Sequence, residues 1–359
     1  MSVPGGPAGS SGRSAAGSGG PDSGFAYLER LVADGLVPGA SAAVAGPAGP
    51  VDERAFGLCD LAERRPFTTR TVGWSASITK PVTVATAMTL VEEGLLDLDE
   101  PVERYLTSFA DQPGPDGPHA PYTPRHLMTH TSGLMGGFPT RQANRWALGG
   151  ALEPSWFSQS IPAVVETLAA TPLEFAPGDR VAYSNAAMFV LARIMETITG
   201  TPYADLVGQR VLAPLGMSDS TYTPPPERAD RVACIYKERD GEPVEIFRFD
   251  PALRITNTAP DGGLFSRPGD YIRFVRAFLD GGGPILSPGS VHAMTSEQVP
   301  GYALGWAIDG GVFNHFGSSG THAWGDPTTG TAAVCYFQYA GDPNPIEEYQ
   351  ARFWELVRG

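Results

Sequence analysis

Two residues near the start of the chain combine the groups that activate a hydroxyl nucleophile. Ser77 and Lys80 are three residues apart, which places them on one face of a helix turn. Unlike arginine, a desolvated lysine can lose its proton, so Lys80 could act as a base toward the Ser77 hydroxyl. Lys80 and Lys237 are the only lysines among 25 basic residues. A chance lysine left by a GC-rich genome is the alternative, so the pair needs support from its context.

The residues after Ser77 predict the helix that would position it. Apolar residues recur downstream at helical spacing, at Val84, Met88, Val91 and Leu95. Pro81 is tolerated only in a first helical turn, and Gly94 is a candidate stop. Ser77 is therefore expected at a helix N-terminus, where the helix dipole favours developing negative charge.

The rest of the chain alternates between strand-like and helical stretches. A helical stretch at 25–32 and strands at 40–45 and 54–58 precede Ser77. Further helices are predicted at Asn185–Thr199, Pro202–Leu212, Pro268–Leu279 and Ile346–Val357. Strands are predicted at 302–308, 311–316, 321–325 and 331–339. This order predicts an α/β (α+β type) domain over 25–359, with one antiparallel sheet built from both ends of the chain. Its α/β lobe would span 25–97 and 256–359, and a mostly helical inserted lobe would span 98–255.

Composition excludes several classes of protein. The chain has 359 residues, 42% of them hydrophobic, and a net charge of −14, which argues against a nucleic-acid partner and gives no attraction to anionic lipid. No apolar run is long enough to span a membrane. Residues 1–24 are rich in Gly, Ser, Pro and Ala and show no secretory signal pattern, so we expect a disordered tail and a cytoplasmic protein. Cys59, Cys234 and Cys335 are widely spaced, which predicts free thiols rather than disulfides or a catalytic cysteine.

Two further motifs follow Ser77-Ile78-Thr79-Lys80 in the chain. They are Tyr183-Ser184-Asn185, which opens a predicted helix, and His315-Phe316-Gly317 on a predicted strand. In this order the three motifs resemble those of the serine β-lactamase and penicillin-binding-protein superfamily, in its class C-like branch of esterases, peptidases and acyltransferases. Supporting runs are similar too, at 125–134, 214–217, 262–266 and 305–306. The resemblance spans about residues 25–359 and implies a β-lactamase/transpeptidase-like fold.

The resemblance also implies roles for individual residues. Ser77 would be the nucleophile, and the backbone N–H groups of Ser77 and Ser318 would form an oxyanion hole. Lys80 and Tyr183, with ordinary pKa values of about 10.4 and about 10, are both candidates for the base. The class C-like branch favours Tyr183 as base, with Lys80 holding the network.

Other site residues have a functional and a structural interpretation. Asn185 would hydrogen-bond Lys80 or the substrate, or else only cap its helix. His315 would transfer protons, or else only fill the third motif beside Gly317. Phe316 and Trp324 would line the pocket, with Trp324 stacking on substrate, or else belong to the core. His126 and His130 are four residues apart, as in some zinc sites, but no glutamate lies beside them, so we expect no metal and no cofactor.

These observations predict a serine-dependent hydrolase or acyltransferase. A Ser77 acyl-enzyme would form on a small-molecule ester or amide, and water, an alcohol or an amine would then remove the acyl group. His315 stands where β-lactamases have a lysine. This difference and the absence of a secretory signal favour an intracellular esterase or a biosynthetic transacylase. The alternatives are a D-amino-acid peptidase or weak β-lactamase, a non-catalytic ligand-binding member of the fold, and a metal-dependent hydrolase. The sequence leaves the oligomeric state open.

Overall fold

The computed structural model describes residues 20–47, 49–136, 160–252, 258–340 and 346–359. Its centre is a seven-stranded sheet with the strand order β3-β2-β1-β11-β10-β9-β8, and every neighbouring pair is antiparallel. The strands are β1 (Gly39–Ala45), β2 (Asp52–Asp60), β3 (Arg65–Pro66), β8 (Ala307–Asp309), β9 (Val312–Gly317), β10 (Thr321–Asp326) and β11 (Thr331–Tyr336). The predicted antiparallel sheet built from both ends of the chain is therefore confirmed.

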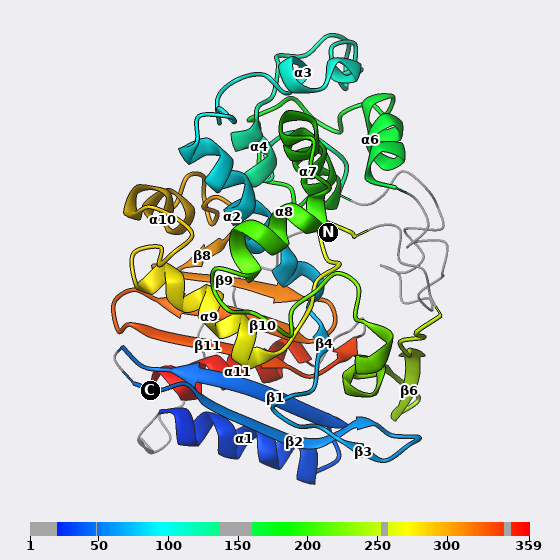
Figure 1. Cartoon of the computed structure of the whole chain (residues 1–359), viewed down its shortest axis with the longest axis vertical. Helices are drawn as coiled ribbons and strands as arrows, with labels where there is room; N and C mark the ends of the chain where they lie inside the picture. The colour runs from blue at the N-terminus through cyan, green and yellow to red at the C-terminus, as the bar shows by residue number, and fades with distance from the viewer. Residues whose placement is uncertain (1–19, 48, 137–159, 253–257, 341–345) are drawn as a thin grey trace.

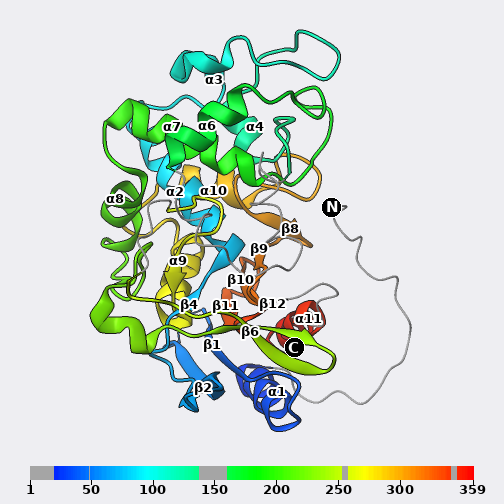
Figure 2. The same ribbon diagram turned by 90° about the vertical axis from the view of Figure 1, so that its right-hand side faces the viewer.

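Helices cover both faces of this sheet. One face packs against α1 (Pro21–Ala33) and α11 (Ile346–Arg358), and the other packs against α9 (Pro268–Leu279). Figure 2 shows α9 and the α1–α11 pair on opposite sides of the strands. Each face buries its own hydrophobic cluster, as expected for a sheet whose side chains alternate between faces.

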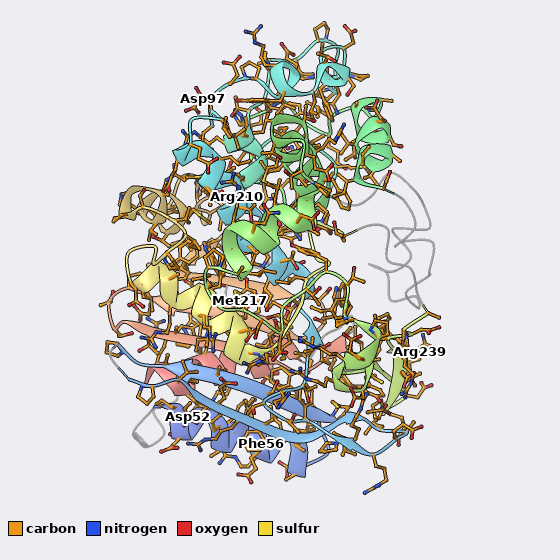
Figure 3. All side chains as sticks on the ribbon, in the orientation of Figure 1. Asp52, Phe56, Asp97, Arg210, Met217 and Arg239 are labelled. Carbon is orange, nitrogen blue, oxygen red and sulfur yellow. The ribbon has the colours of Figure 1, made fainter. Side chains whose placement is uncertain are left out.

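A second group of helices lies above the sheet in Figure 1 and surrounds α2 (Thr79–Glu92). These helices are α3 (Val102–Tyr105), α4 (Pro124–Met128), α6 (Ile161–Ala169), α7 (Asn185–Thr199), α8 (Tyr203–Val207) and α10 (Pro288–Thr295). α8 continues as a π-helical turn, Gly208–Leu212, whose Arg210 binds Glu93 just beyond the end of α2 (Figure 3). Because its surroundings are protein on all sides, α2 is buried all round rather than along one stripe.

Small sheets complete the fold. A parallel bridge joins β12 (Tyr339–Ala340) to the hairpin of β5 (Ile235–Arg239) and β6 (Glu242–Phe247), and β4 (Gly73–Trp74) pairs with β7 (Phe265–Ser266). Within the described residues, no helix is both long enough and apolar enough to cross a membrane. All three cysteines are free, as predicted.

Several predicted boundaries need correction. Residues 1–19 of the predicted tail lie outside the described residues, but 21–24 belong to α1, which starts with Pro21 and packs Gly24 against Phe353 and Val357 of α11. The predicted strand 302–308 is reduced to β8, since Tyr302 forms only isolated bridges. The predicted strand 331–339 is two strands, because Gln338 has a left-handed backbone (φ 53°) that turns the chain out of the large sheet.

Candidate active site

Ser77 lies at the only opening in a long buried segment. Every residue from 71 to 90 is buried except Ser77, which is half-buried. Ser77 belongs to a short 3-10 turn, Ala76–Ile78, that leads directly into α2. Ala76 before it has φ 48°, a conformation that costs a non-glycine residue energy and that clusters at functional sites. The structure thus presents one hydroxyl at the start of a buried helix.

Lys80 is fully buried and lies beside this hydroxyl. Its Nζ is 3.2 Å from Ser77 Oγ and donates to the backbone carbonyl oxygen of Asp261 at 2.7 Å. Burial lowers the pKa of Lys80 to about 8, although the nearby Asp261 charge opposes the shift. The amine can therefore lose its proton near neutral pH while it remains in contact with Ser77.

Tyr183 completes the group. Burial raises its pKa, and a hydrogen bond to Ser77 only partly offsets this effect. Lys80 Nζ lies 4.7 Å from the centroid of the Tyr183 ring, over its face. The sequence prediction that these three residues meet is therefore matched by the geometry, with both Lys80 and Tyr183 in contact with the hydroxyl.

His130 holds Tyr183 in place, a role that sequence reasoning did not assign to it. The backbone N–H of Ala182 donates to the His130 carbonyl at 2.8 Å, and that of Ser184 donates to His130 Nδ1 at 3.2 Å. The His130 ring lies 4.7 Å from the Tyr183 ring, and His130 itself has φ 58°. His126 instead bonds Thr123 at the start of α4, so the two histidines do not form a metal pair.

The third motif packs directly against Ser77. A Cβ built on Gly317 would overlap Thr321 Oγ1 and would lie 3.2 Å from the Ser77 backbone nitrogen. Thr321 and Ser319 donate to the carbonyls of Ser75 and Trp74, each at 2.7 Å. Only glycine at 317 lets the two segments approach so closely. Ser318 follows immediately, at the position predicted for the second oxyanion donor.

His315 is neutral and has one free acceptor nitrogen. Its Nδ1 lies 2.7 Å from the Phe316 carbonyl, so Nδ1 carries the proton. The buried Nε2 has no hydrogen-bond partner among the described residues. Burial, reinforced by the Lys80 charge, lowers the pKa of His315 to about 3. His315 therefore offers an unpaired acceptor 6.1 Å, ring to ring, from Tyr183.

Two predicted pocket residues lie on the wrong face of the sheet. Adjacent residues of an antiparallel pair share a face, and His315 pairs with Ala323, whereas Phe316 pairs with His322. Phe316 stacks on His322 at 3.8 Å, and Trp324 stacks on Trp354 of α11 at 5.9 Å. The predicted stacking of Trp324 on substrate is wrong, because its side chain is buried in the core under α1 and α11.

Asn185 opens α7 beside the site. The capping alternative for Asn185 is wrong, because Ser184 is the N-cap and its Oγ accepts from the Ala187 N–H at 3.1 Å. Asn185 is half-buried and follows Tyr183 by two residues.

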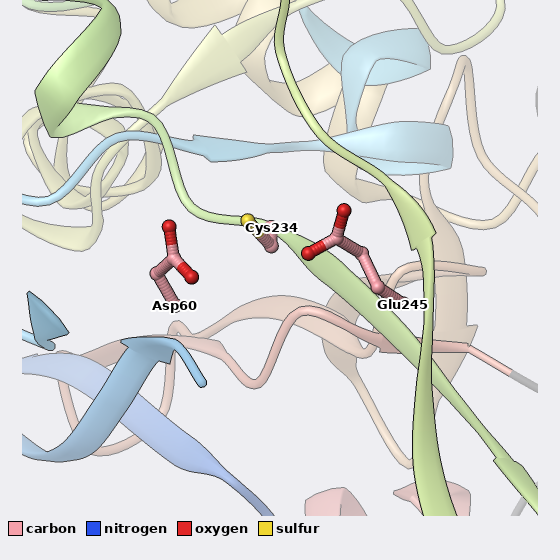
Figure 4. A group of neighbouring side chains, drawn as sticks. All are labelled: Asp60, Cys234 and Glu245. Atoms are coloured by element: carbon pink, nitrogen blue, oxygen red, sulfur yellow. The ribbon is translucent and has the colours of Figure 1, made fainter. Parts of the chain in front are cut away.

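A separate group of side chains has the composition of a metal site. Asp60, Cys234 and Glu245 place their ligand atoms within 4.8 Å of one another (Figure 4). Arg248 already binds both carboxylates, at 2.6 Å to Asp60 and 2.7 Å to Glu245. Burial also raises the pKa of the Cys234 thiol to about 12, whereas zinc binds the thiolate. This group does not fit a metal ion.

Comparison with known proteins agrees with this geometry. The family model described as Beta-lactamase matches residues 26–353. The chain belongs to the beta-lactamase family. The recognition and the fold predicted from the three motifs are thereby confirmed.

Named relatives include both uncharacterised proteins and enzymes. Protein Rv1367c of Mycobacterium tuberculosis is 32% identical over 294 residues, covering 77% of this chain and 72% of that protein. Esterase EstB of Burkholderia gladioli is 34% identical over 231 residues, covering 62% of this chain and 56% of EstB. Among solved structures, EstCE1, titled a hydrolase with promiscuous acyltransferase activity, superposes with a TM-score of 0.81 at 22% identity over 94% of this chain and 98% of that one. Members of this family with this fold thus act on ester or amide bonds.

Proposed function

We propose that this protein is a serine-dependent hydrolase or acyltransferase that forms an acyl-enzyme on Ser77. The observation that carries the proposal is the contact of Lys80 Nζ, 3.2 Å from Ser77 Oγ, in a site that also contains Tyr183. A serine hydroxyl needs such a neighbouring base to attack a carbonyl carbon. The similarity to an esterase supports esters as substrates.

We assign the base role in the first step to Lys80. With a pKa of about 8, deprotonating Lys80 at pH 7 costs about 1.4 kcal/mol. The pKa of Tyr183 is raised above its ordinary value of about 10, so ionising it at pH 7 costs more than about 4 kcal/mol. The resemblance favoured Tyr183 as base; the electrostatics of this chain favour Lys80, with the Tyr183 hydroxyl relaying a proton to the leaving group.

The reaction then has two balanced halves. Ser77 Oγ bonds to the carbonyl carbon as its proton passes to Lys80, and the carbonyl oxygen takes up charge between the N–H groups of Ser77 and Ser318. The carbon–leaving-group bond breaks as Tyr183 protonates the departing alcohol or amine, and Lys80 returns a proton to Tyr183. In the second half, water or another acceptor attacks the same carbon, gives its proton to the Lys80–Tyr183 pair and regenerates the Ser77 hydroxyl.

The substrate is proposed to be uncharged where it faces His315. A neutral imidazole cannot balance a carboxylate, whereas an ester or amide bearing a hydroxyl could donate to the free Nε2. This argument favours a small-molecule esterase or transacylase over a β-lactamase.

A substrate panel tests the proposal. Simple p-nitrophenyl esters, a D-amino-acid amide and a penicillin should be compared with wild-type protein and Ser77→Ala. We expect ester turnover that is lost in Ser77→Ala. Adding amines and alcohols at millimolar concentration should show whether transfer competes with hydrolysis, since a bound acceptor has a large effective concentration. No turnover of any ester or amide by folded wild-type protein would contradict the proposal.

A further inference from the structure

A sharp turn at 259–264 is fastened to the helix that carries Lys80. Ala259 in this turn has φ 37°, and its carbonyl accepts from the N–H groups of Gly262 at 2.9 Å and Gly263 at 2.6 Å. Side chains one helical turn apart on α2 bind its backbone. The contacts are Thr83 Oγ1 to Pro260 O at 2.6 Å, Lys80 Nζ to Asp261 O at 2.7 Å, and Leu264 N to Thr79 Oγ1 at 3.2 Å.

The same turn also touches the segment that carries Ser77. A Cβ built on Gly262 would lie 3.6 Å from the backbone of Ala76, the residue before Ser77. The turn is therefore a wall of the site, held by its backbone from two sides. Its side chains are not needed for this attachment.

The carboxyl group of Asp261 has no structural role that the described contacts explain. Asp261 is 5% exposed, and its buried Oδ1 has no hydrogen-bond partner among the described residues. A buried carboxylate without partners is costly, and such groups persist mainly where they serve a function. Since the Asp261 carbonyl receives the Lys80 ammonium at 2.7 Å, the side chain of the same residue lies beside that cation.

We propose that Asp261 is a positioning residue of this centre that acts through Lys80, by placing a negative charge beside the amine that contacts Ser77. The effect on acylation rests on the function proposed above, but the effect on the charge of Lys80 does not. An opposite charge at this range favours the ammonium form, whereas burial disfavours it. Asp261 thus sets the pH at which Lys80 becomes available as a base.

Asp261 and Lys80 are the charged pair among the groups that interact here. The other titratable groups around them are Tyr183, Tyr203 on α8, His130 and His315. Burial raises the pKa of both tyrosines and lowers the pKa of both histidines, so all four are neutral at pH 7. Burial also raises the pKa of Asp261 to about 6, so mild acid removes its charge first.

The scarcity of lysine allows a direct test. Lysine labelled with ¹³C at Cε gives two side-chain signals, from Lys80 and Lys237, and Lys237→Arg assigns them. In wild-type protein we expect the Lys80 signal to titrate near pH 8 and to sense Asp261 near pH 6. In Asp261→Asn the lower step should disappear, and the Lys80 midpoint should fall by about one unit or more.

The matched control is Asp205→Asn, which removes the same charge from an exposed position on α8. It should leave the Lys80 midpoint within about 0.3 units of wild type, because solvent screens an exposed charge. An unchanged midpoint in folded Asp261→Asn, or an equal shift in Asp205→Asn, would overturn the proposal. If the asparagine variant does not fold, Asp261→Ala is measured in its place, with the same expectation.

A kinetic measurement separates this proposal from the proposed function. The rate at which a fluorophosphonate labels Ser77 should rise with pH in wild type, and Asp261→Asn should move this rise to lower pH by the same amount as the NMR midpoint. A merely structural role would lower the rate at every pH without moving the rise. If the Lys80 midpoint moves but the rate profile does not, the pairing of Asp261 with Lys80 stands and the base role of Lys80 is contradicted.

Discussion

Two buried aspartates in this molecule have opposite surroundings. Asp60 is 1% exposed and receives two hydrogen bonds from Arg248, at 2.6 and 2.9 Å, and one from Arg65 at 3.1 Å. These partners lower its pKa to about 2. Asp261 is 5% exposed, its Oδ1 lacks a partner among the described residues, and burial raises its pKa to about 6.

The contrast distinguishes a structural charge from a functional one. The Asp60 group in Figure 4 has the residue types of a metal site, but its charges are already neutralised by arginine. The Ser77 centre has a single buried cation, Lys80, with polar atoms on His130, His315 and Asp261 left unpaired among the described residues. Unpaired buried polar atoms cost stability, so a site that retains them is prepared for a ligand or a proton.

The largest expected effect is on Lys80. Lys80→Ala should slow acylation by about 10⁴-fold, close to 5.5 kcal/mol, because both the base and the contact with Ser77 are lost. Lys80→Arg should be nearly as damaging, since arginine cannot give up its proton. Burst kinetics with an activated ester measures both variants. An arginine variant that keeps more than about a tenth of wild-type activity, a loss below about 1.4 kcal/mol, would contradict the base role.

Tyr183→Phe should have the next largest effect. The ring still fills its place against His130, so the free energy of unfolding should change by less than about 1.5 kcal/mol. Loss of the hydroxyl removes proton relay, which is worth roughly 10²- to 10⁴-fold in rate. Amides should suffer more than activated esters, because their leaving group needs the proton. Equal losses for both substrates would argue against the relay.

Asp60→Asn should affect stability and leave activity within about twofold. Because the Asp60 pKa is lowered, the ion pair stabilises the fold above about pH 4, and this contribution is lost as pH falls through about 2. Arg248 is 40% exposed, which reduces the expected loss at pH 7 to about 1–2 kcal/mol. Urea unfolding measures it, with the exposed Asp52→Asn as control. Unchanged stability would remove the structural half of the comparison.

The smallest effect concerns pH. With the Lys80 pKa lowered to about 8, acylation should rise about tenfold for each unit up to pH 8 and then level off. The rate of ester acylation between pH 5.5 and 9.5 gives the profile. A flat profile across pH 6–8 would show that the neutral amine is not required.

Local signals made parts of this structure predictable. Helices α7 and α9 have the predicted bounds, because Gly200 ends α7 in a left-handed conformation and Pro268 starts α9. The hairpin of β5 and β6 was missed, although Asp240-Gly241 at its turn, both with positive φ, is a strong hairpin signal.

The site was predictable only where short motifs carried it. Ser77 and Lys80 are one helical turn apart, and Tyr183 opens a helix of its own. Asp261 was missed because it lies 181 residues from Lys80 in an ordinary turn sequence, and only the fold brings them together. Trp324 was misassigned because strand periodicity does not tell which face of a sheet carries the site. The cytoplasmic location stays a prediction.

The central claim is that Ser77 alone becomes acylated, and mass spectrometry tests it most directly. Wild-type protein and Ser77→Ala should be treated with a fluorophosphonate, or trapped with a slowly hydrolysed activated ester, and then digested and sequenced. We predict one adduct, on the peptide and residue Ser77, formed faster at pH 8 than at pH 6 and absent from Ser77→Ala. An adduct on Ser132 or Ser318, or equal labelling of the alanine variant, would contradict the account.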